Sequence, residues 1–263
     1  EGGTREALPN VNVYLANTMI GTTTNPQGEF LIRTVPAGTY NLVVSMAGYG
    51  RQILNIRLFE PLQKPLDIRL LEQPFETVPV EVLARDQSEW RKGLRLFTGY
   101  LLGKTKNAGD CRIVNPEVLD FKEGMGSGEF HASAREPLLI ENKALGYRLE
   151  LILQIFSVGE TAFKYGGVTR FEELKATDGN EAERWKKNRL RSYRGSLPHF
   201  LLALLKNNLD EEGFIVLSTK ELPFQHSSIP FTETIKPDDI IKPGEFPFER
   251  LLRFRDYLEI RYR

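Results

Sequence analysis

The sequence predicts a mainly β protein, in which a small N-terminal β-sandwich is followed by an α+β domain with antiparallel strands and a helical pair. Two observations lead to this prediction. Short stretches of alternating apolar and polar residues, separated by Gly/Pro turns, fill residues 1–72. Later segments place apolar residues at helical spacing, between further strand-like stretches, which indicates helices grouped apart from an antiparallel sheet.

Residues 1–72 are predicted to form short strands joined by tight turns. The turns are "NPQG" (Asn25–Gly28) and "VPAG" (Val35–Gly38), in which Pro fixes φ and Gly accepts a positive φ. This spacing of short strands is typical of a sandwich or barrel. The predicted strands contain the alternating residues Val11, Val13 and Leu15, then Phe30 and Ile32, then Tyr40, Leu42 and Val44, and the runs "ILNIRL" (Ile53–Leu58) and "LDIRLL" (Leu66–Leu71).

Residues 73–80 are predicted to be a Pro-containing connector, and residues 81–263 the α+β domain. A helix is expected to start at Asp86 or Ser88 and to end at Gly103, a residue suited to a helix C-terminus. The helical pair is predicted at Glu181–Arg194 and Leu197–Asn208, and Pro223–Pro247 is expected to be irregular. Strands are predicted in "RIVNPEVLDFKE", "GEFHASA", "PLLIENKALGYRLELILQIFSV", "AFKYGGVTRFEELK" (turned or interrupted by its Gly-Gly pair), "GFIVLST" and "YLEIRYR".

The turn residues of the first region fall at offsets that belong to a known family. The stretch contains Leu8-Pro9, "GTTT" (Gly21–Thr24), Gly28 with Phe30, "VPAGTY" (Val35–Tyr40) and Gly48-Tyr49. It resembles the carboxypeptidase regulatory-like domain, a small prealbumin-like sandwich. Asn25 stands where the family usually has Asp, and the family's first strand is missing, so we expect the chain to be trimmed at its N-terminus. The strand-like "YLEIRYR" leads us to expect that the natural protein continues at the other end as well.

A weaker resemblance extends over most of the remaining chain. The runs Phe97–Gly103, Cys111–Leu119, Glu136–Tyr147 and Arg184–Leu204 resemble a group of secreted or envelope proteins of Gram-negative bacteria that carry this domain. The resemblance implies a location in the periplasm or at the outer membrane, with a protein partner there. The family's name reflects a likeness to an accessory domain of carboxypeptidases and implies no peptidase activity.

Composition narrows the classes of function. Lys and Arg number 35 and so do Asp and Glu, so the net charge is zero, which argues against a dedicated nucleic-acid binder. The single Cys111 excludes an internal disulfide framework and a multi-cysteine zinc site. No apolar run is long enough for a membrane span.

The residues that carry chemistry do not form a known catalytic or metal-binding pattern. His131, His199 and His226 are isolated in sequence, so neither a metal nor another cofactor is predicted. Ser196 and His199 are three residues apart, but Ser196 precedes an apolar helix with Pro198 in its first turn, as an N-cap does. Its oxygen is then expected to accept from a backbone N–H near residue 199. Cys111 has no assignable base and is interpreted as a small, partly buried residue.

One basic segment remains as a candidate binding surface. "ERWKKNRLRSYR" (Glu183–Arg194) is predicted to be a helix with Trp185 on its buried side. Arg184, Lys187 and Arg191 lie along another side, where they face either solvent alone or a partner. These three are the candidate partner-binding residues that the sequence nominates.

Three hypotheses for function follow. The first, which we prefer, is a non-catalytic envelope protein that acts in protein–protein recognition or assembly at the outer membrane. The second is a carbohydrate- or peptidoglycan-binding module, in which exposed Trp or Tyr would hold the sugar; Trp90 and Trp185, however, sit at core-like helical spacing. The third is a hydrolase, which requires Glu136, Glu141, His131 or His199 to converge in a cleft.

Overall fold

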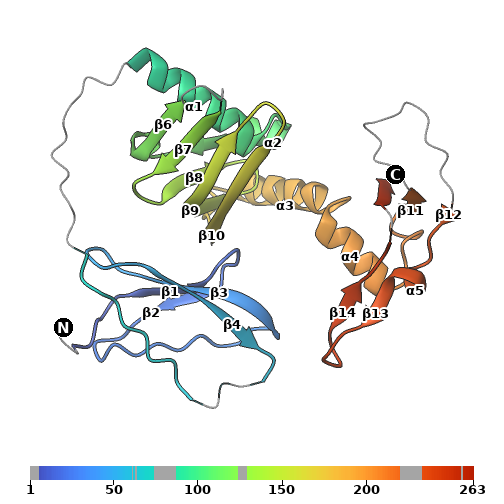
Figure 1. Cartoon of the computed structure of the whole chain (residues 1–263), viewed down its shortest axis with the longest axis horizontal. Coiled ribbons are helices and arrows are strands. Elements are labelled where there is room, and N and C mark those ends of the chain that lie inside the picture. The colour runs from blue at the N-terminus through green and yellow to red at the C-terminus, as the bar shows by residue number, and fades with distance from the viewer. Residues whose placement is uncertain are drawn as a thin grey trace. The chain divides into compact units, whose positions relative to one another are not determined.

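The structure, a computed structural model, describes residues 6–60, 62, 64–73, 87–123, 129–219, 233–255 and 257–263. The contacts divide the chain into two compact units, Glu1–Ala182 and Glu183–Arg263. Figure 1 shows the elements of both. Most of the predicted connector, residues 74–80, and His226 lie outside the described residues.

The chain begins with one four-stranded antiparallel sheet, in the order β2-β1-β3-β4. Its residues alternate between the two faces, as the sequence pattern requires. On one face Val13, Leu15, Leu42 and Val44 form a buried cluster. The strands are β1 (Asn12–Leu15), β2 (Gly21–Thr23), β3 (Gly38–Ser45) and β4 (Gln52–Leu58).

Two of the predicted N-terminal strands are not strands in the structure. The segments around Phe30 and Ile32 and around Leu66 and Ile68 run without a ladder partner, although these side chains pack on the buried cluster of the sheet. The alternation in sequence reports only that one side of an extended segment is buried. It does not require that the backbone hydrogen-bond to a neighbour, and here the second layer of the sandwich is completed by side-chain packing.

The second sheet of the first unit is built around the long strand β9. Along one edge, residues 147–151 of β9 pair with β8 and residues 157–158 pair with β7; along the other edge β9 pairs with β10. The full order is β5-β8-β9-β7-β6, with β10 on β9. The strands are β5 (Cys111–Ile113), β6 (Leu119–Glu123), β7 (Phe130–Ala134), β8 (Leu138–Asn142), β9 (Tyr147–Val158) and β10 (Phe163–Glu173).

The Gly166-Gly167 pair bends β10 without ending it. The pairing register with β9 shifts between these two residues, which is a β-bulge. A Cβ on Gly167 would lie 2.6 Å from the Ile152 carbonyl oxygen, so only glycine fits. The pair was predicted to turn or interrupt the strand, and the bulge is the form that this interruption takes.

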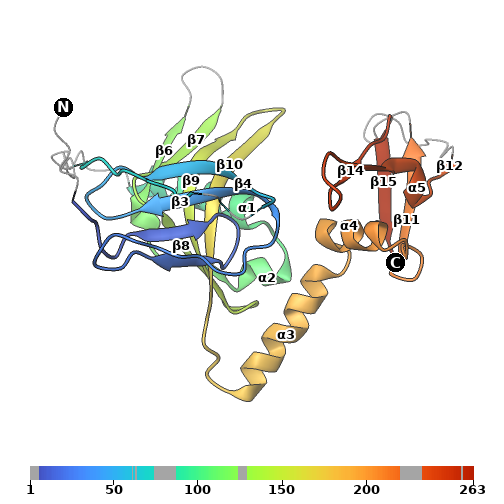
Figure 2. The ribbon, with the colours of Figure 1, turned by 90° about the horizontal axis from the view of Figure 1, so that it is seen from below.

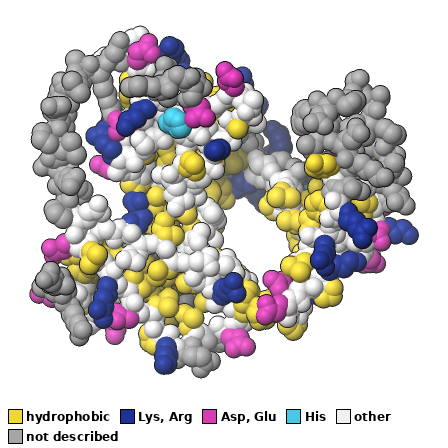
Figure 3. Space-filling model, in the orientation of Figure 1, with side chains coloured by type: hydrophobic (Ala, Val, Ile, Leu, Met, Phe, Trp, Pro, Cys, Tyr) yellow, Lys and Arg dark blue, Asp and Glu magenta, His cyan; other side chains and the backbone are white. Residues whose placement is uncertain are grey.

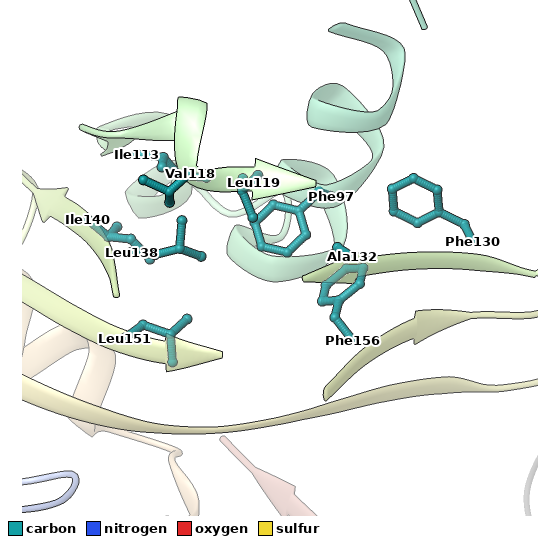
Figure 4. Packing of buried hydrophobic residues seen from close by; sticks show 10 residues of the cluster. All are labelled: Phe97, Ile113, Val118, Leu119, Phe130, Ala132, Leu138, Ile140, Leu151 and Phe156. Carbon is teal, nitrogen blue, oxygen red and sulfur yellow. The ribbon is translucent and has the colours of Figure 1, made fainter. Parts of the chain in front are cut away.

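Helix α1 (Gln87–Leu102) packs against this sheet and contributes side chains to its hydrophobic core. Phe97 is fully buried and packs with residues from several strands, as Figure 4 shows. Trp90 donates its indole N–H to the Leu119 carbonyl at 3.1 Å. Gly103 has φ +76° immediately after the helix, so both the helix and its predicted end are confirmed. Two short helical segments follow, α2 (Lys106–Gly109) and the 3-10 turn η1 (Pro116–Val118).

The two sheets of the first unit are joined by side chains and by backbone. Tyr14 and Val43 pack with Ile152 and Val168 in one buried cluster. The Asn17 N–H donates to the Thr169 carbonyl at 2.5 Å. The Phe171 N–H donates to the Thr18 carbonyl at 3.2 Å. The loop after β1 therefore occupies the edge of β10 that β9 leaves open.

Helix α3 (Gly179–Tyr193) carries the boundary between the units in its first turn and leads into the C-terminal unit, shown from a second side in Figure 2. There, helix α4 covers a three-stranded sheet in the order β12-β11-β15. Phe200, Leu204, Phe214 and Val216 form the centre of its core. The elements are α4 (Leu197–Leu205), β11 (Phe214–Thr219), β12 (Glu233–Thr234), α5 (Pro237–Ile240), β13 (Ile241–Pro243), β14 (Arg250–Leu252) and β15 (Tyr257–Tyr262).

The predicted fold class is confirmed, because 37% of the described residues are in strands and 23% in helices, and the paired strands are antiparallel. The prediction that Pro223–Pro247 is irregular is wrong for residues 233–243, which hold β12, α5 and β13. Lys236 is the N-cap residue that precedes α5, and the Asp239 carboxylate accepts its backbone N–H; the many prolines of the segment obscured this cap in the sequence.

Candidate functional site

Helix α3 starts at a polar cap and presents three of its basic residues along one exposed side. The Asp178 carboxylate accepts the Glu181 N–H at 2.8 Å, and the Glu181 carboxylate accepts the Thr177 N–H at 2.9 Å. This reciprocal pair satisfies backbone donors that the first turn leaves open. The helix then runs to Tyr193 and ends before Gly195, whose φ is +74°.

The predicted basic side of α3 is present in the structure. Arg184, Lys187 and Arg191 are exposed and are spaced at i, i+3 and i+7, so they lie on one side of the helix. Trp185 is 5% exposed and points elsewhere on the helix, as predicted. The helix and the exposure of the three basic side chains are thus established. Their role in binding stays a prediction.

The turn between α3 and α4 confirms the structural interpretation of Ser196. Its hydroxyl accepts the His199 N–H at 3.3 Å, with Pro198 in the first turn of α4. Ser196 is therefore an N-cap.

His199 is held by polar groups on both ring nitrogens. It is 5% exposed; its Nδ1 accepts the Gly195 N–H at 3.0 Å, and its Nε2 lies 2.9 Å from the Glu212 carboxylate. Because Nδ1 accepts, the ring proton of the neutral form sits on Nε2 and is donated to Glu212. The ring also contacts Tyr193, Phe214 and Tyr262, with centroid distances of 4.9, 4.8 and 5.6 Å.

Sequence reasoning missed this His–Glu pair. Glu212 is adjacent to Glu211 in a stretch that resembles a solvated acidic turn, and a separation of 13 residues does not indicate contact. A weak signal was present in the positions themselves, since His199 lies in the apolar helix "LPHFLLALL" and a buried imidazole there needs a polar partner.

The other residues considered for catalysis lie at separate places on the surface. His131 pairs with Glu129 at 3.3 Å on the surface, and Glu141 pairs with Arg148 at 3.2 Å. Glu136 lies on the exposed turn before β8. The structure therefore does not bring His131, Glu136 and Glu141 together as a cleft would require.

Cys111 lies at the start of β5 and is partly buried. Its thiol donates to the Asn107 carbonyl at 3.3 Å. Burial, and to a lesser degree the negative charge of Asp110, raises the pKa of the thiol. This shift is the opposite of what a nucleophilic cysteine needs.

Within the part of the chain that the structure describes, no three His, Cys, Asp or Glu side chains lie close enough to hold a metal ion. No helix of the described residues is long and apolar enough to cross a membrane. An open hollow beside β13 contains none of the candidate residues; it is lined by Ile241, Pro243, Gly244, Glu245, Phe246, Pro247 and Arg250.

Comparison with known proteins agrees with the N-terminal fold. Its four-stranded sheet and packed second layer place it among small β-sandwich domains. Residues 1–82 match the family model described as CarboxypepD_reg-like domain, so this part of the chain is a CarboxypepD_reg-like domain, a regulatory and non-catalytic domain type. No curated protein and no solved structure matches the chain.

Proposed function

We propose that the protein is a non-catalytic component of the Gram-negative cell envelope, at the periplasm or outer membrane, that recognises a partner protein there. The observation that carries this proposal is the exposed basic side of α3, formed by Arg184, Lys187 and Arg191. Three cations at fixed positions on one rigid helix suit an acidic surface of a partner, because complementary charge steers association and fixes its register.

The surface around α3 and α4 supports protein recognition as well. Large apolar side chains of the C-terminal unit are exposed; Leu197 and Leu205 of α4 are 64% and 55% exposed. On the face of this unit seen in Figure 3, yellow hydrophobic and dark-blue basic side chains lie next to one another. Mixed apolar and cationic surface of this kind is common at protein interfaces, whereas nucleic-acid surfaces are predominantly basic.

The carbohydrate-binding alternative has less support. Trp185 is buried and Trp90 is partly buried with its indole N–H bonded to Leu119, so neither tryptophan offers an open ring face. A sugar platform would have to use exposed tyrosines such as Tyr100 or Tyr165.

The test compares three versions of the full chain in affinity purification from a native envelope fraction. The wild type should retain a reproducible partner, and the triple variant Arg184→Glu, Lys187→Glu and Arg191→Glu should lose it. The control Lys104→Glu, Lys164→Glu and Lys175→Glu makes the same change in net charge at exposed lysines away from α3 and α4, and should retain the partner. All three should melt at nearly the same temperature. A partner that survives the first triple variant, or is lost equally from both, would disprove a role for this side of α3.

A further inference from the structure

Strand β15 has a neighbour on one side only. Among the described residues it pairs with β11, while its other edge faces no strand. Its side chains are correspondingly open: Ile260 is 39% and Tyr262 is 42% exposed, although their partners in register, Val216 and Phe214, are buried. An open edge that carries apolar side chains and neither Lys nor Pro is a template for pairing with another strand.

The hydrogen bonds of the sheet define which backbone groups face this edge. The Arg263 N–H donates to the Gly213 carbonyl at 3.0 Å, so the backbone of Arg263 points at β11. The Ile235 N–H donates to the Val216 carbonyl at 3.1 Å, so the backbone of Val216 points away from β15. Successive residues of a strand direct their N–H and C=O groups to opposite sides. Both bonds therefore indicate that the backbone groups of residues 257, 259, 261 and 263 point toward β11. The backbone groups that face the open edge belong to Leu258, Ile260 and Tyr262.

The side chains of β15 have a matching symmetry. Consider two copies of the strand that pair antiparallel with Ile260 opposite Ile260. Glu259 of each copy then lies opposite Arg261 of the other copy, and Leu258 of each lies opposite Tyr262 of the other. Glu259 and Arg261 already share one face, where Arg261 Nε lies 2.6 Å from Glu259 Oε1. The neighbouring registers would oppose Glu259 to Glu259 or Arg261 to Arg261. Opposite charges facing across strands are favourable and like charges are not, so charge selects the first register.

We propose that β15 is a homodimerisation strand, which pairs antiparallel with β15 of a second copy about a two-fold axis through Ile260. Two independent features favour this register. The N–H and C=O of Ile260 face the open edge, and the charges of Glu259 and Arg261 are complementary when two copies are related by an axis through Ile260. The sheets of the two copies then join into one, and the exposed parts of Ile260 and Tyr262 are covered. A two-fold axis closes the assembly at two copies. This surface is distinct from the basic side of α3.

Charge exchange tests the register. Light scattering of the purified full chain should give a dimer for the wild type. The substitutions Glu259→Arg and Arg261→Glu, each made alone, should raise the dissociation constant of the dimer at least about tenfold, because like charges then face each other across the axis. An equimolar mixture of these two variants should form a one-to-one heterodimer, since each supplies the charge that the other lacks. That recovery also shows that both variants are folded.

Crosslinking tests the axis. In a Cys111→Ser background, Ile260→Cys should form a disulfide-linked dimer on mild oxidation, because directly opposed residues of a hydrogen-bonded pair have the Cα spacing that a disulfide requires. Ile155→Cys, at a 49% exposed position on β9, should remain unlinked. The α3 triple variant should dimerise like the wild type.

A wild type that stays monomeric at its highest soluble concentration would overturn the proposal. So would single variants that associate like the wild type, or a mixture that gives no heterodimer. Equal crosslinking at residues 155 and 260 would overturn the two-fold axis.

Discussion

The Nε2 atom of His199 lies 2.9 Å from the Glu212 carboxylate, while Nδ1 of the same ring accepts the Gly195 N–H. This one imidazole therefore connects the break between α3 and α4 to the segment that leads into β11. The ring is 5% exposed and its neighbours are aromatic, so water cannot readily replace the Gly195 N–H at Nδ1.

We expect His199→Ala to lower the free energy of unfolding by about 2–4 kcal/mol, because it leaves a cavity and an unpaired Gly195 N–H. His199→Asn keeps an acceptor near Nδ1 and should lose less. Glu212→Gln should cost about 1 kcal/mol or less, since the Glu212 side chain is 45% exposed and water can reach its carboxylate. Urea unfolding of the four proteins measures this order. Equal losses for Ala and Asn would contradict the role assigned to Nδ1.

Two glycines of α1 should respond in opposite directions to the same substitution. A Cβ on Gly93 would lie 2.7 Å from Cδ2 of Phe121, whereas a Cβ on Gly99 would meet no heavy atom within 4 Å. Gly93→Ala should therefore destabilise by about 1–3 kcal/mol through overpacking. Gly99→Ala should stabilise by about 0.5–1 kcal/mol through helix propensity. Thermal melts of both variants check the pair, and a gain for Gly93→Ala would show that α1 is not held against Phe121.

The buried Tyr14 predicts a loss of stability at alkaline pH. Burial, and then the charge of Glu150, raises the pKa of Tyr14 to about 12 from its ordinary value of 10.0, and its hydroxyl has no hydrogen-bond partner among the described residues. Below pH 10 the hydroxyl is neutral in both states. Above pH 10 only the unfolded state ionises, so stability falls as pH rises, by about 2–3 kcal/mol when pH 12 is reached.

The variant Tyr14→Phe isolates this effect from other groups that titrate in the same range. At pH 8 it should be as stable as the wild type or slightly more so, because it removes an unsatisfied buried hydroxyl. Between pH 10 and 12 the difference should grow in its favour. Urea unfolding across this range measures it, and parallel pH curves for the two proteins would contradict the prediction.

Cys111 should be a slow thiol in the folded protein. Burial raises its pKa, so the thiolate is scarce at neutral pH, and the side chain is only partly accessible. We expect iodoacetamide to alkylate Cys111 much more slowly in buffer than in urea, with the rate rising with pH. The variant Cys111→Ser gives the background. A labelling rate equal to that of the unfolded chain would mean that the thiol is open.

Much of the fold could be predicted because the spacing of apolar residues and the residues that begin or end helices and turns are properties of short stretches of sequence. The spacing of Trp90, Leu94, Phe97 and Leu101 predicts α1, and Gly103 predicts its end. Ser196 and Pro198 likewise predict the start of α4. The alternation at Phe30 and Ile32 misled, because burial of one side produces the same pattern with or without a ladder partner.

The candidate sites could be predicted only in part. The basic side of α3 could be found because its residues recur at helical spacing within one helix. The partnership of His199 with Glu212, and the phase of β15 against β11, follow from where distant elements lie. The symmetric order of charges in "YLEIRYR" was visible in the sequence, but its meaning required knowing which edge of the strand is open.

The bonds between the loop at Asn17 and Thr18 and the outer edge of β10 bear on how this chain evolves. A family model matches residues 1–82 by themselves. The loop at Asn17 and Thr18 of this domain nevertheless covers the outer edge of β10, a strand that lies later in the chain. A recombination that exchanged residues 1–82 for another domain of the same family would inherit the sandwich and lose this cover, unless the incoming loop carried an Asn with the same left-handed backbone, φ +62°. Homologous chains should therefore inherit the two parts together, with Asn retained at position 17, because the groups it bonds at position 169 are backbone groups.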